Sequence, residues 1–345
     1  MKTRITIAVC VSFIVILSGV AFGSVTIPPG DVLSIICHKA GGVPLPGHIE
    51  SSSVAIVWNL RTPRVLLAFF VGAALSVAGS VMQSVLRNPL ASPYTLGVSS
   101  GASLGAAIVI LYGITIPFIK IFTLPLLGFA FGLGTIVLAV AVASRLDGQM
   151  ENVTIILTGM VFALFINAVT MLMSALSSEN LHLLVLWQMG SFSMKDWQAV
   201  FIVAPAALAG TLFVSHFNRE LDIMTFGEEQ ARTMGVDLRR VKWILLITSA
   251  ALTGSAVAFA GIIGFLDLVA PHVVRRLFGS SHRYVVPMAA VIGGGFMIIC
   301  DLVARTIVSP SELPVGAVTA IIGAPFFAYI YFGGRKKAKR GEKGC

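Results

Sequence analysis

Long stretches without a single charged residue are the feature that most limits how this chain folds. Nine such stretches occur, and each approaches or exceeds the ~20 residues with which an α-helix crosses ~30 Å of hydrocarbon. They lack the strict alternation of membrane barrel strands. The stretches span residues 5–30, 65–86, 88–119, 121–144, 152–178, 197–218, 243–266, 284–300 and 313–334. The pattern predicts an all-α polytopic membrane protein.

Composition supports the same class of protein. Hydrophobic residues make up 57% of the chain and charged residues 11%, against about 45–50% and about 25% in soluble domains. No segment between the stretches is large enough for a soluble catalytic domain or a basic nucleic-acid-binding domain. The net charge of +9 is therefore expected to face anionic membrane lipid, and nucleic acid is not an expected partner.

The basic residues at both ends predict the number of spans. Lys2 and Arg4 stand at the start, and residues 335–340 carry a second basic cluster, so both termini are predicted to be cytoplasmic. Two cytoplasmic termini require an even number of crossings, and the short apolar piece 268–274 supplies the tenth. Ten spans place 18 Lys and Arg inside and six outside. The membrane is expected to be the cytoplasmic (inner) membrane of a prokaryote.

Two helix-breaking segments suggest an internal repeat. Residues 88–93 (Asn-Pro-Leu-Ala-Ser-Pro) follow a span on the predicted inner side, and residues 261–272 follow a later span on the predicted outer side. Broken helices on opposite faces are typical of inverted repeats in transporters. The predicted organisation is a retained first span (1–25), an external segment (26–60), a first repeat of spans 2–5 (61–178), a cytoplasmic loop (219–242), a second repeat of spans 7–10 (243–334) and a basic cytoplasmic tail (335–345).

Small residues recur every four positions on two spans. They are Ala68, Gly72, Ser76 and Ser80 on the second span, and Gly97, Gly101 and Gly105 on the third. Such stripes allow helix backbones to approach closely in lipid. Both static packing and a moving helix seam explain them, and packing is the favoured interpretation.

Two acids and three arginines are candidates for function. Asp301 precedes Arg305 by four residues, which is the spacing of an ion pair on one helix face, and a structural pair and a transport role both remain open. Asp267 lies near the predicted outer end of its helix, where reaching the interface is the simple alternative. Arg61, Arg64 and Arg305 lie at predicted external helix ends, either as snorkelling anchors or as a docking surface for an acidic partner.

The sequence gives no support for a catalytic or metal-binding site. Residues 97–101 match the G-x-S-x-G string, but they begin a membrane helix and have no His/Asp pair beside them. The chain has no phosphate-binding P-loop sequence, and its six histidines and four cysteines lack metal-ligand spacing. The sequence therefore predicts neither an enzyme nor a bound metal or cofactor.

Several strings together resemble the FecCD family, the permeases of ABC importers for iron–siderophores, haem and cobalamin. The match runs in the family's order from about residue 58 to 332. The strings are Arg61-Thr62-Pro63-Arg64; Arg87-Asn88-Pro89-Leu90-Ala91 with Leu96 to Ala102; Gly227-Glu228-Glu229-Gln230-Ala231-Arg232 with Gly235-Val236; Gly264-Phe265 with Ala270-Pro271-His272; and Asp301, Ala304-Arg305 and Glu312 to Gly316. Asp267 departs from the pattern, because the family more often has a small residue there.

The resemblance implies a type II ABC importer permease with ten helices per subunit. Its implied partners are a second copy of itself or a homologous permease, two cytoplasmic ATP-binding subunits that hold the ATP, and an external substrate-binding protein. The implied docking residues are Arg61, Arg64 and Arg305. The implied ATPase-coupling residues in the cytoplasmic loop are Gly227, Glu228, Glu229, Ala231, Arg232 and Gly235. The implied pathway and gate residues are Asn88, Pro89, Leu90, Gly97, Ser99, Ser100, Gly101, Thr158, Gly159, Pro271 and His272.

The fifth and tenth spans match the helices that line the pathway in this family. The expected substrate is an iron chelate (siderophore), with haem or cobalamin as the alternative. A secondary transporter is the rival class, and it would need ion-coupling carboxylates at mid-membrane, for which only Asp267 and Asp301 qualify.

Overall fold

The computed structural model describes residues 1–23, 27–177 and 179–341, with side chains described to residue 329. The elements are α1 (Lys2–Ala21), α2 (Pro29–Gly41), α3 (Ser51–Ala55), η1 (Ile56–Arg61), α4 (Thr62–Val85), α5 (Val98–Tyr112), η2 (Lys120–Phe122), α6 (Thr123–Leu146), α7 (Asn152–Leu176), α8 (Leu181–Gln188), α9 (Trp197–His216), α10 (Asn218–Met224), α11 (Glu228–Thr233), α12 (Leu238–Ala260), α13 (Leu266–Phe278), α14 (His282–Thr306) and α15 (Val315–Gly341). The predicted boundary at 25/26, the repeat end at 178 and tail residues 342–345 lie outside the described residues.

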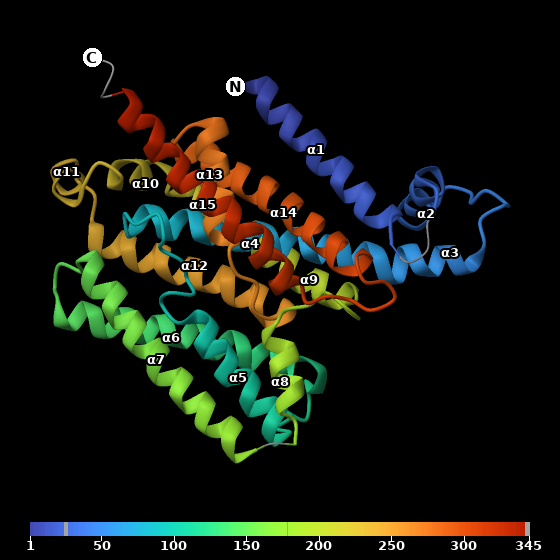
Figure 1. Cartoon of the computed structure of the whole chain (residues 1–345), viewed down its shortest axis with the longest axis horizontal. Coiled ribbons are helices and arrows are strands. Elements are labelled where there is room, and N and C mark those ends of the chain that lie inside the picture. The colour runs from blue at the N-terminus through green and yellow to red at the C-terminus, as the bar shows by residue number, and fades with distance from the viewer. Residues whose placement is uncertain (24–26, 178, 342–345) are drawn as a thin grey trace.

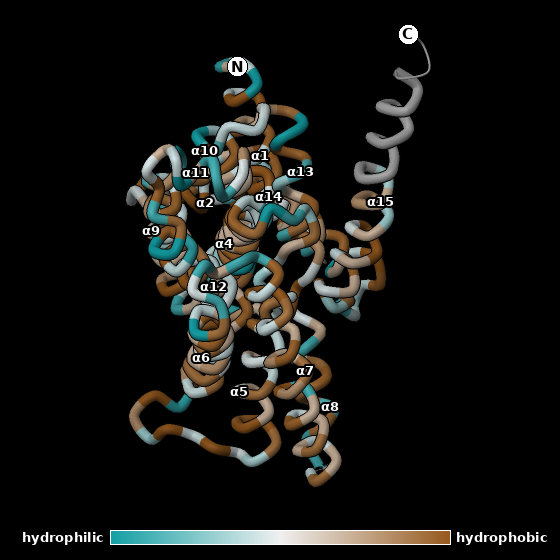
Figure 2. Tube along the Cα trace, turned by 90° about the vertical axis from the view of Figure 1, so that its left-hand side faces the viewer, coloured by the Kyte–Doolittle hydropathy of each residue, from teal (hydrophilic) through white to brown (hydrophobic). Residues whose placement is uncertain are grey.

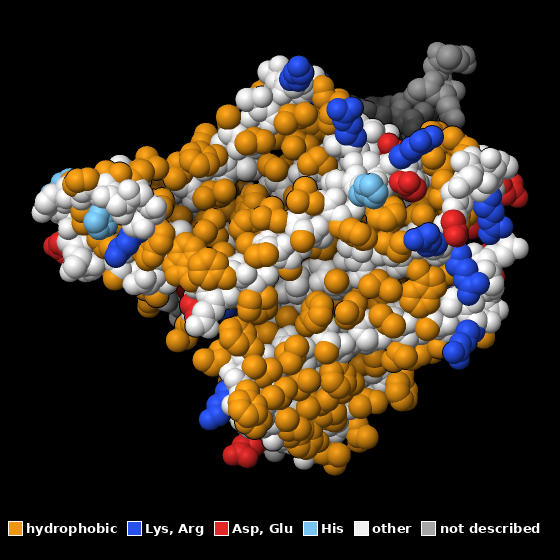
Figure 3. All heavy atoms as spheres, turned by 180° about the vertical axis from the view of Figure 1, so that it is seen from behind, with side chains coloured by type: hydrophobic (Ala, Val, Ile, Leu, Met, Phe, Trp, Pro, Cys, Tyr) orange, Lys and Arg blue, Asp and Glu red, His pale blue; other side chains and the backbone are white. Residues whose placement is uncertain are grey.

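The prediction of an all-α membrane fold is confirmed. Within the described ranges, seven helical segments are long and apolar enough to cross a membrane, and α5 and the apolar part of α15 are shorter. With α13, which corresponds to the short piece 268–274, these are the ten predicted elements: α1, α4, α5, α6, α7, α9, α12, α13, α14 and α15. Figure 3 shows a broad hydrophobic face with Lys and Arg gathered at one end of the molecule.

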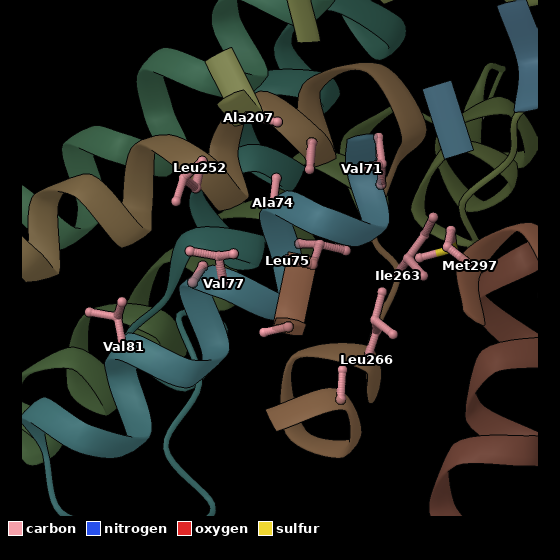
Figure 4. Close-up of a cluster of buried hydrophobic side chains, with 14 of the residues drawn as sticks. Val71, Ala74, Leu75, Val77, Val81, Ala207, Leu252, Ile263, Leu266 and Met297 are labelled. Carbon is pink, nitrogen blue, oxygen red and sulfur yellow. The ribbon is translucent and has the colours of Figure 1, made fainter. Parts of the chain in front are cut away.

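The helix α4 forms the centre of the bundle (Figure 1). Nearly every residue from Val65 to Val85 is buried, and α4 packs against α14, α12, α9 and α13. Figure 4 shows side chains of α4 such as Leu75 and Val77 lying among Leu252 of α12 and Leu266 of α13. A second layer, made of α5, α6, α7 and α8, covers α12 on the side away from α14.

The bundle has two ends, an arginine end and a coupling end, which carry different candidate residues. The arginine end carries the end of α1 and the start of α4, where Arg61 contacts Ala21. The coupling end carries the start of α1, the loop between α9 and α12, and the helices α10 and α11. Figure 2 views the bundle from the coupling end, where hydrophilic residues gather on α10 and α11.

Small residues let the helix backbones touch. A Cβ atom added at Gly79 of α4 would overlap the carbonyl oxygen of Asp267, and one added at Gly72 would meet the carbonyl oxygen of Gly293. On α5, Gly101 and Gly105 approach the backbone of α6 in the same way. Each approach is too close for any larger side chain, so Gly72, Gly101 and Gly105 of the predicted small-residue stripes lie at helix–helix contacts.

The two helix-breaking segments begin at opposite ends of the bundle, as predicted, and they also contact each other, which the sequence did not predict. After leaving α4 and α12, both turn back into the bundle and contact each other. The Tyr94 hydroxyl donates to the carbonyl oxygen of Ile263 at 3.0 Å, and Ser92 hydrogen-bonds the carboxylate of Asp267. The helices that follow, α5 and α13, run toward opposite ends, as an inverted repeat requires.

We expect Gly79→Ala to lower the free energy of unfolding by about 1–3 kcal/mol, because the added methyl group pushes α4 away from the backbone of α13. Thermal unfolding in detergent measures the change. Gly134→Ala is the matched control, since Gly134 lies in α6 with no atom within 4 Å of the added Cβ. Equal effects of the two substitutions would contradict this account of the packing.

Candidate functional site

At the arginine end, a buried carboxylate organises three chain segments. Asp301 of α14 has no exposed surface, and its Oδ1 accepts hydrogen bonds from Arg64 Nε at 3.0 Å and Arg64 Nη2 at 2.8 Å. Arg64 Nη1 also donates to Glu312, in the loop before α15, at 2.6 Å. The predicted pair within α14 is present, with Arg305 Nε 3.5 Å from Asp301 Oδ2. The principal partner of Asp301 is nevertheless Arg64, which the i, i+4 spacing did not reveal.

The other two arginines bind the end of α1. Arg61 Nη1 donates to the carbonyl oxygens of Ala21 at 2.8 Å and Val20 at 3.2 Å, and Arg305 Nη2 donates to that of Gly19. The last carbonyls of a helix have no donors within that helix, and arginine side chains satisfy them well. Arg61 and Arg305 are largely buried, so they do not extend along the surface as snorkelling anchors would.

The three arginines share one hollow at this end. It has a volume of about 610 Å³ and is partly open to the surface. Among the described residues that line it, the ionisable side chains are those of Arg61, Arg64, Lys195, Asp196, Arg305 and Glu312. The structure therefore brings together the three predicted docking residues and adds Lys195, Asp196 and Glu312, none of which the sequence predicted as a docking residue.

Asp267 is buried inside the bundle and does not reach the interface. Only 2% of its surface is exposed, and it lies in the first turn of α13, where a negative charge is favoured by the helix dipole. Its partner Ser92 comes from the opposite helix-breaking segment. The simple interface explanation for Asp267 is therefore wrong: the acid connects the two segments.

The predicted gate residues of the helix-breaking segments also meet. His272 Nε2 lies 3.4 Å from the carbonyl oxygen of Pro89, and the Asn88 side chain accepts a hydrogen bond from the Leu90 amide at 2.9 Å. Leu90 is exposed and Pro271 is buried. The contact between His272 and Pro89 thus brings the loop after α4 against α13.

The other predicted pathway residues lie around α5 and α7. Gly97 directly precedes α5 with a φ of 95°, a conformation suited to glycine, and Gly159 of α7 packs against Leu96. Thr158 donates to the carbonyl oxygen of Thr154 in its own helix at 2.7 Å. Gly101 packs against α6 and not toward a cavity.

A second, polar hollow of about 410 Å³ lies between α5, α7 and α8. Ser99 and Ser100 line it, as predicted, together with five polar residues that the sequence reasoning missed. These are Ser103, Asn167, Thr170, Ser174 and Gln188. The described lining contains hydroxyl and amide groups without an ionisable side chain. The missed signal was the recurrence of polar residues along one face of the apolar helix α7.

At the coupling end, a buried lysine joins α11 to the loop before α7. Lys242 of α12 has no exposed surface, and its Nζ donates to Glu228 at 2.8 Å and to the carbonyl oxygen of Met150 at 2.6 Å. Arg232 Nη1 makes a second connection by donating to Gln149 at 3.0 Å. These contacts place the predicted residues Glu228 and Arg232 against the α6–α7 loop.

The remaining coupling residues shape α11 itself. Gly227 precedes the helix with a φ of 132° and Gly235 follows it with a φ of 82°, so both ends need glycine. Ala231 is fully buried, whereas Glu229 is exposed. The helix is thus a short protruding element whose inner face is anchored and whose outer face is accessible.

Comparison with known proteins identifies the family. A family model described as the FecCD transport family matches residues 10–332. This chain belongs to the FecCD transport family. It is 43% identical over 315 residues to YvrB, an uncharacterised ABC transporter permease protein of Bacillus subtilis (strain 168), with 91% of this chain and 89% of the relative covered.

Other FecCD relatives agree on the type of protein. The cobalamin import system permease protein BtuC of Halobacterium salinarum is 34% identical over 325 residues, covering 90% of this chain and 86% of the relative. A solved inward-facing structure, provisionally assigned to a metal-chelate type ABC transporter, superposes with a TM-score of 0.83 at 27% identity. The superposition covers 96% of this chain and 100% of the chain in that structure. The chain is thus a multi-pass membrane permease of an ABC importer, and ATP hydrolysis belongs to a separate subunit.

We expect the stabilisation contributed by Glu312 to disappear in acid. Burial alone raises the pKa of Glu312, but the hydrogen bond from Arg64, its charge and a hydrogen bond from Ser193 outweigh burial and lower the pKa below its usual value. A carboxylate with a lowered folded-state pKa stabilises the fold above its unfolded-state pKa, and this contribution is lost as the pH falls through the folded-state pKa.

The measurement compares thermal unfolding of the wild type and Glu312→Gln between about pH 7 and about pH 3. The wild type is expected to be the more stable near neutral pH, and the difference is expected to shrink progressively toward the acid end. Glu179→Gln, at an exposed glutamate of the same end, is the control and should show no such trend. A difference that stays undiminished at the acid end would contradict the role of the Arg64–Glu312 bond.

Proposed function

We propose that this chain is the permease subunit of an importer that moves a metal chelate, specifically an iron chelate of the siderophore type, into the cytoplasm. Two copies, or this chain and a homologous permease, would form the pathway between them, with both termini in the cytoplasm. Two ATP-binding subunits would bind the coupling end, and an external binding protein would deliver the chelate to the arginine end. No cofactor is assigned to this chain.

The observation that carries the proposal is the uncovered face of α7. Large apolar residues such as Leu164 and Met171 are exposed there, and so is the polar Asn167. A polar side chain at membrane depth is costly in lipid and normally faces a water-filled cavity or a partner. Together with the hydroxyl-lined hollow beside it, this face suits a pathway that a large polar chelate crosses while binding only weakly.

The substrate class rests on the relatives and on the chemistry of the hollow. The proteins compared above include a cobalamin permease and a transporter of the metal-chelate type. Both names indicate a metal held inside an organic ligand, which hides the metal charge from the permease. A lining of hydroxyl and amide groups without ionisable residues fits such a shielded cargo better than a bare cation, which would call for carboxylates.

The secondary-transporter alternative lacks available ion-coupling carboxylates at the two positions that qualified. Asp301 is paired with Arg64 and Arg305, and Asp267 is hydrogen-bonded to Ser92. Both acids therefore hold helices together, and a proton or sodium ion would have to break these contacts to bind.

We expect charge reversal in the hollow of the arginine end to weaken docking of the binding protein. Lys195→Glu changes a lining residue outside the Asp301 cluster, and it should reduce binding-protein-stimulated ATPase activity about tenfold in liposomes containing the assembled importer. Arg64→Glu should reduce it at least as much. Lys120→Glu, an exposed position of the same end outside the hollow, is the matched control. Equal stimulation in all four proteins would reject this hollow as the docking surface.

We expect Lys242→Met to uncouple ATP hydrolysis from transport. Without the ammonium group, Glu228 loses its connection through Lys242 to the Met150 carbonyl in the α6–α7 loop, so movement of α11 is no longer passed by this route to α7. The chelate transported per ATP hydrolysed should fall severalfold while ATPase activity persists. Arg239→Met, at an exposed residue of the same helix, is the control.

The exchanged pair Glu228→Lys/Lys242→Glu tests whether the contact itself matters. Partial recovery of the transport-to-ATP ratio would support the ion pair as the element that matters, because the two opposite charges meet again while a carboxylate at position 242 cannot donate to the Met150 carbonyl. An unchanged ratio in Lys242→Met would show that this contact does not transmit the movement.

A further inference from the structure

An apolar groove of about 720 Å³ lies between α1 and α14 at the coupling end. Its described lining has two parts: a basic mouth formed by Arg4 and Arg276, and a body of apolar or small residues. The body comprises Ile7, Ala8, Val11, Ser12, Val15, Leu277, Phe278, Ile292, Gly295, Phe296 and Ile299. Neither the transport pathway nor the coupling and docking residues use this groove.

The groove exists because the two helices pack tightly at only one end. Near the arginine end, Gly19 of α1 is buried against Ile298, and at the middle of α1 Ser12, at the edge of the groove, donates to the carbonyl oxygen of Val291 at 3.1 Å. Toward the coupling end, Ile7 and Val11 remain 57% and 52% exposed. The space between α1 and α14 therefore widens toward the N-terminus of α1.

The length of the groove matches one leaflet of a bilayer. From Arg4 to Val15 the helix rises about 16 Å at 1.5 Å per residue, roughly half of the ~30 Å hydrocarbon core. The basic mouth thus lies at the membrane surface when the apolar body lies within one leaflet.

The mouth is built for a negative charge. Arg4 Nη1 donates to the carbonyl oxygen of Leu277 at 2.9 Å, which holds its guanidinium beside Arg276. Both arginines are exposed, and the described lining of the groove contains no acidic residue. Guanidinium groups bind phosphate oxygens through paired hydrogen bonds, and an arginine near the surface adds attraction to anionic lipid.

We propose that this groove binds one anionic phospholipid, with an acyl chain between α1 and α14 and the phosphate at Arg4 and Arg276. The basic tail at residues 335–340 of the same chain would be repelled by the mouth. A zwitterionic lipid fills the groove but gains less from the arginines. The lipid bridges α1 to α13 and α14 where direct contact between these helices is sparse.

Native mass spectrometry of the purified permease, from bilayers with equal amounts of phosphatidylglycerol and phosphatidylcholine, tests the proposal. The wild type should retain one phosphatidylglycerol in preference to phosphatidylcholine. Arg4→Gln/Arg276→Gln should lower the phosphatidylglycerol-bound fraction about tenfold. Arg145→Gln/Arg239→Gln removes two exposed charges at the same end outside the groove and should retain the lipid as the wild type does.

Ala8→Phe provides a second test by filling the body of the groove while leaving both arginines in place. It should also lose the bound phosphatidylglycerol, whereas lipid attracted only by surface charge would remain. Equal retention of both lipids by the wild type, equal loss in the two double variants, or wild-type retention by Ala8→Phe would overturn the proposal. Thermal unfolding of each variant confirms folding, and lipid retention is measured without any transport assay.

Discussion

The ion cluster around Asp301 is the interaction on which the arginine end depends. A carboxylate without exposed surface is costly unless charged donors surround it, and Arg64 and Arg305 supply them from α4 and α14. The same arginines continue to Glu312 and to the end of α1. One buried negative charge thus joins the central helix, the first helix and the loop that leads into α15. Removing it would leave two guanidinium groups without their buried partner.

The need to give every buried polar group a partner also explains how the two helix-breaking segments pack in the middle of the bundle. The chain leaves helical geometry at residues 86–97 and 261–265, and polar groups there must find partners within the protein, because lipid offers none. The two segments satisfy each other through Tyr94 and Ile263 and through Ser92 and Asp267. Gly79 allows this contact to lie directly against α4. A break in one half of the chain is therefore stabilised by the break in the other half.

The sequence predicted the elements of this fold far better than their contacts. Charge-free length predicts where spans occur, because the cost of burying charge in lipid acts on each segment separately. Nine of the ten elements were found in this way, and the even number of crossings required by two cytoplasmic termini added α13 as the tenth. The partner of Asp301 could not be found by spacing, because Arg64 lies 237 residues away in the chain. Asp267 was misjudged for the same reason, since Ser92 belongs to a distant segment. Lys242 carried no signal, because a single lysine at the start of a span is ordinary for a membrane helix.

If the proposed binding protein docks at the arginine end, the pairing there limits how its acidic side chains can be recognised. An incoming acidic side chain meets guanidinium groups that already hold Asp301, Glu312 and the carbonyls of α1. The described lining of the hollow carries four basic and two acidic side chains. The hollow therefore has a net positive charge, and its attraction for an acidic partner is moderate. Of the two acids that bind Arg64, Glu312 is the one that an incoming acid can replace, because it lies in the loop and is partly exposed, whereas Asp301 is buried. An acid that competes with Glu312 for Arg64 would loosen the loop before α15 as it binds, and this connects recognition at the surface to a helix that the family resemblance assigns to the pathway.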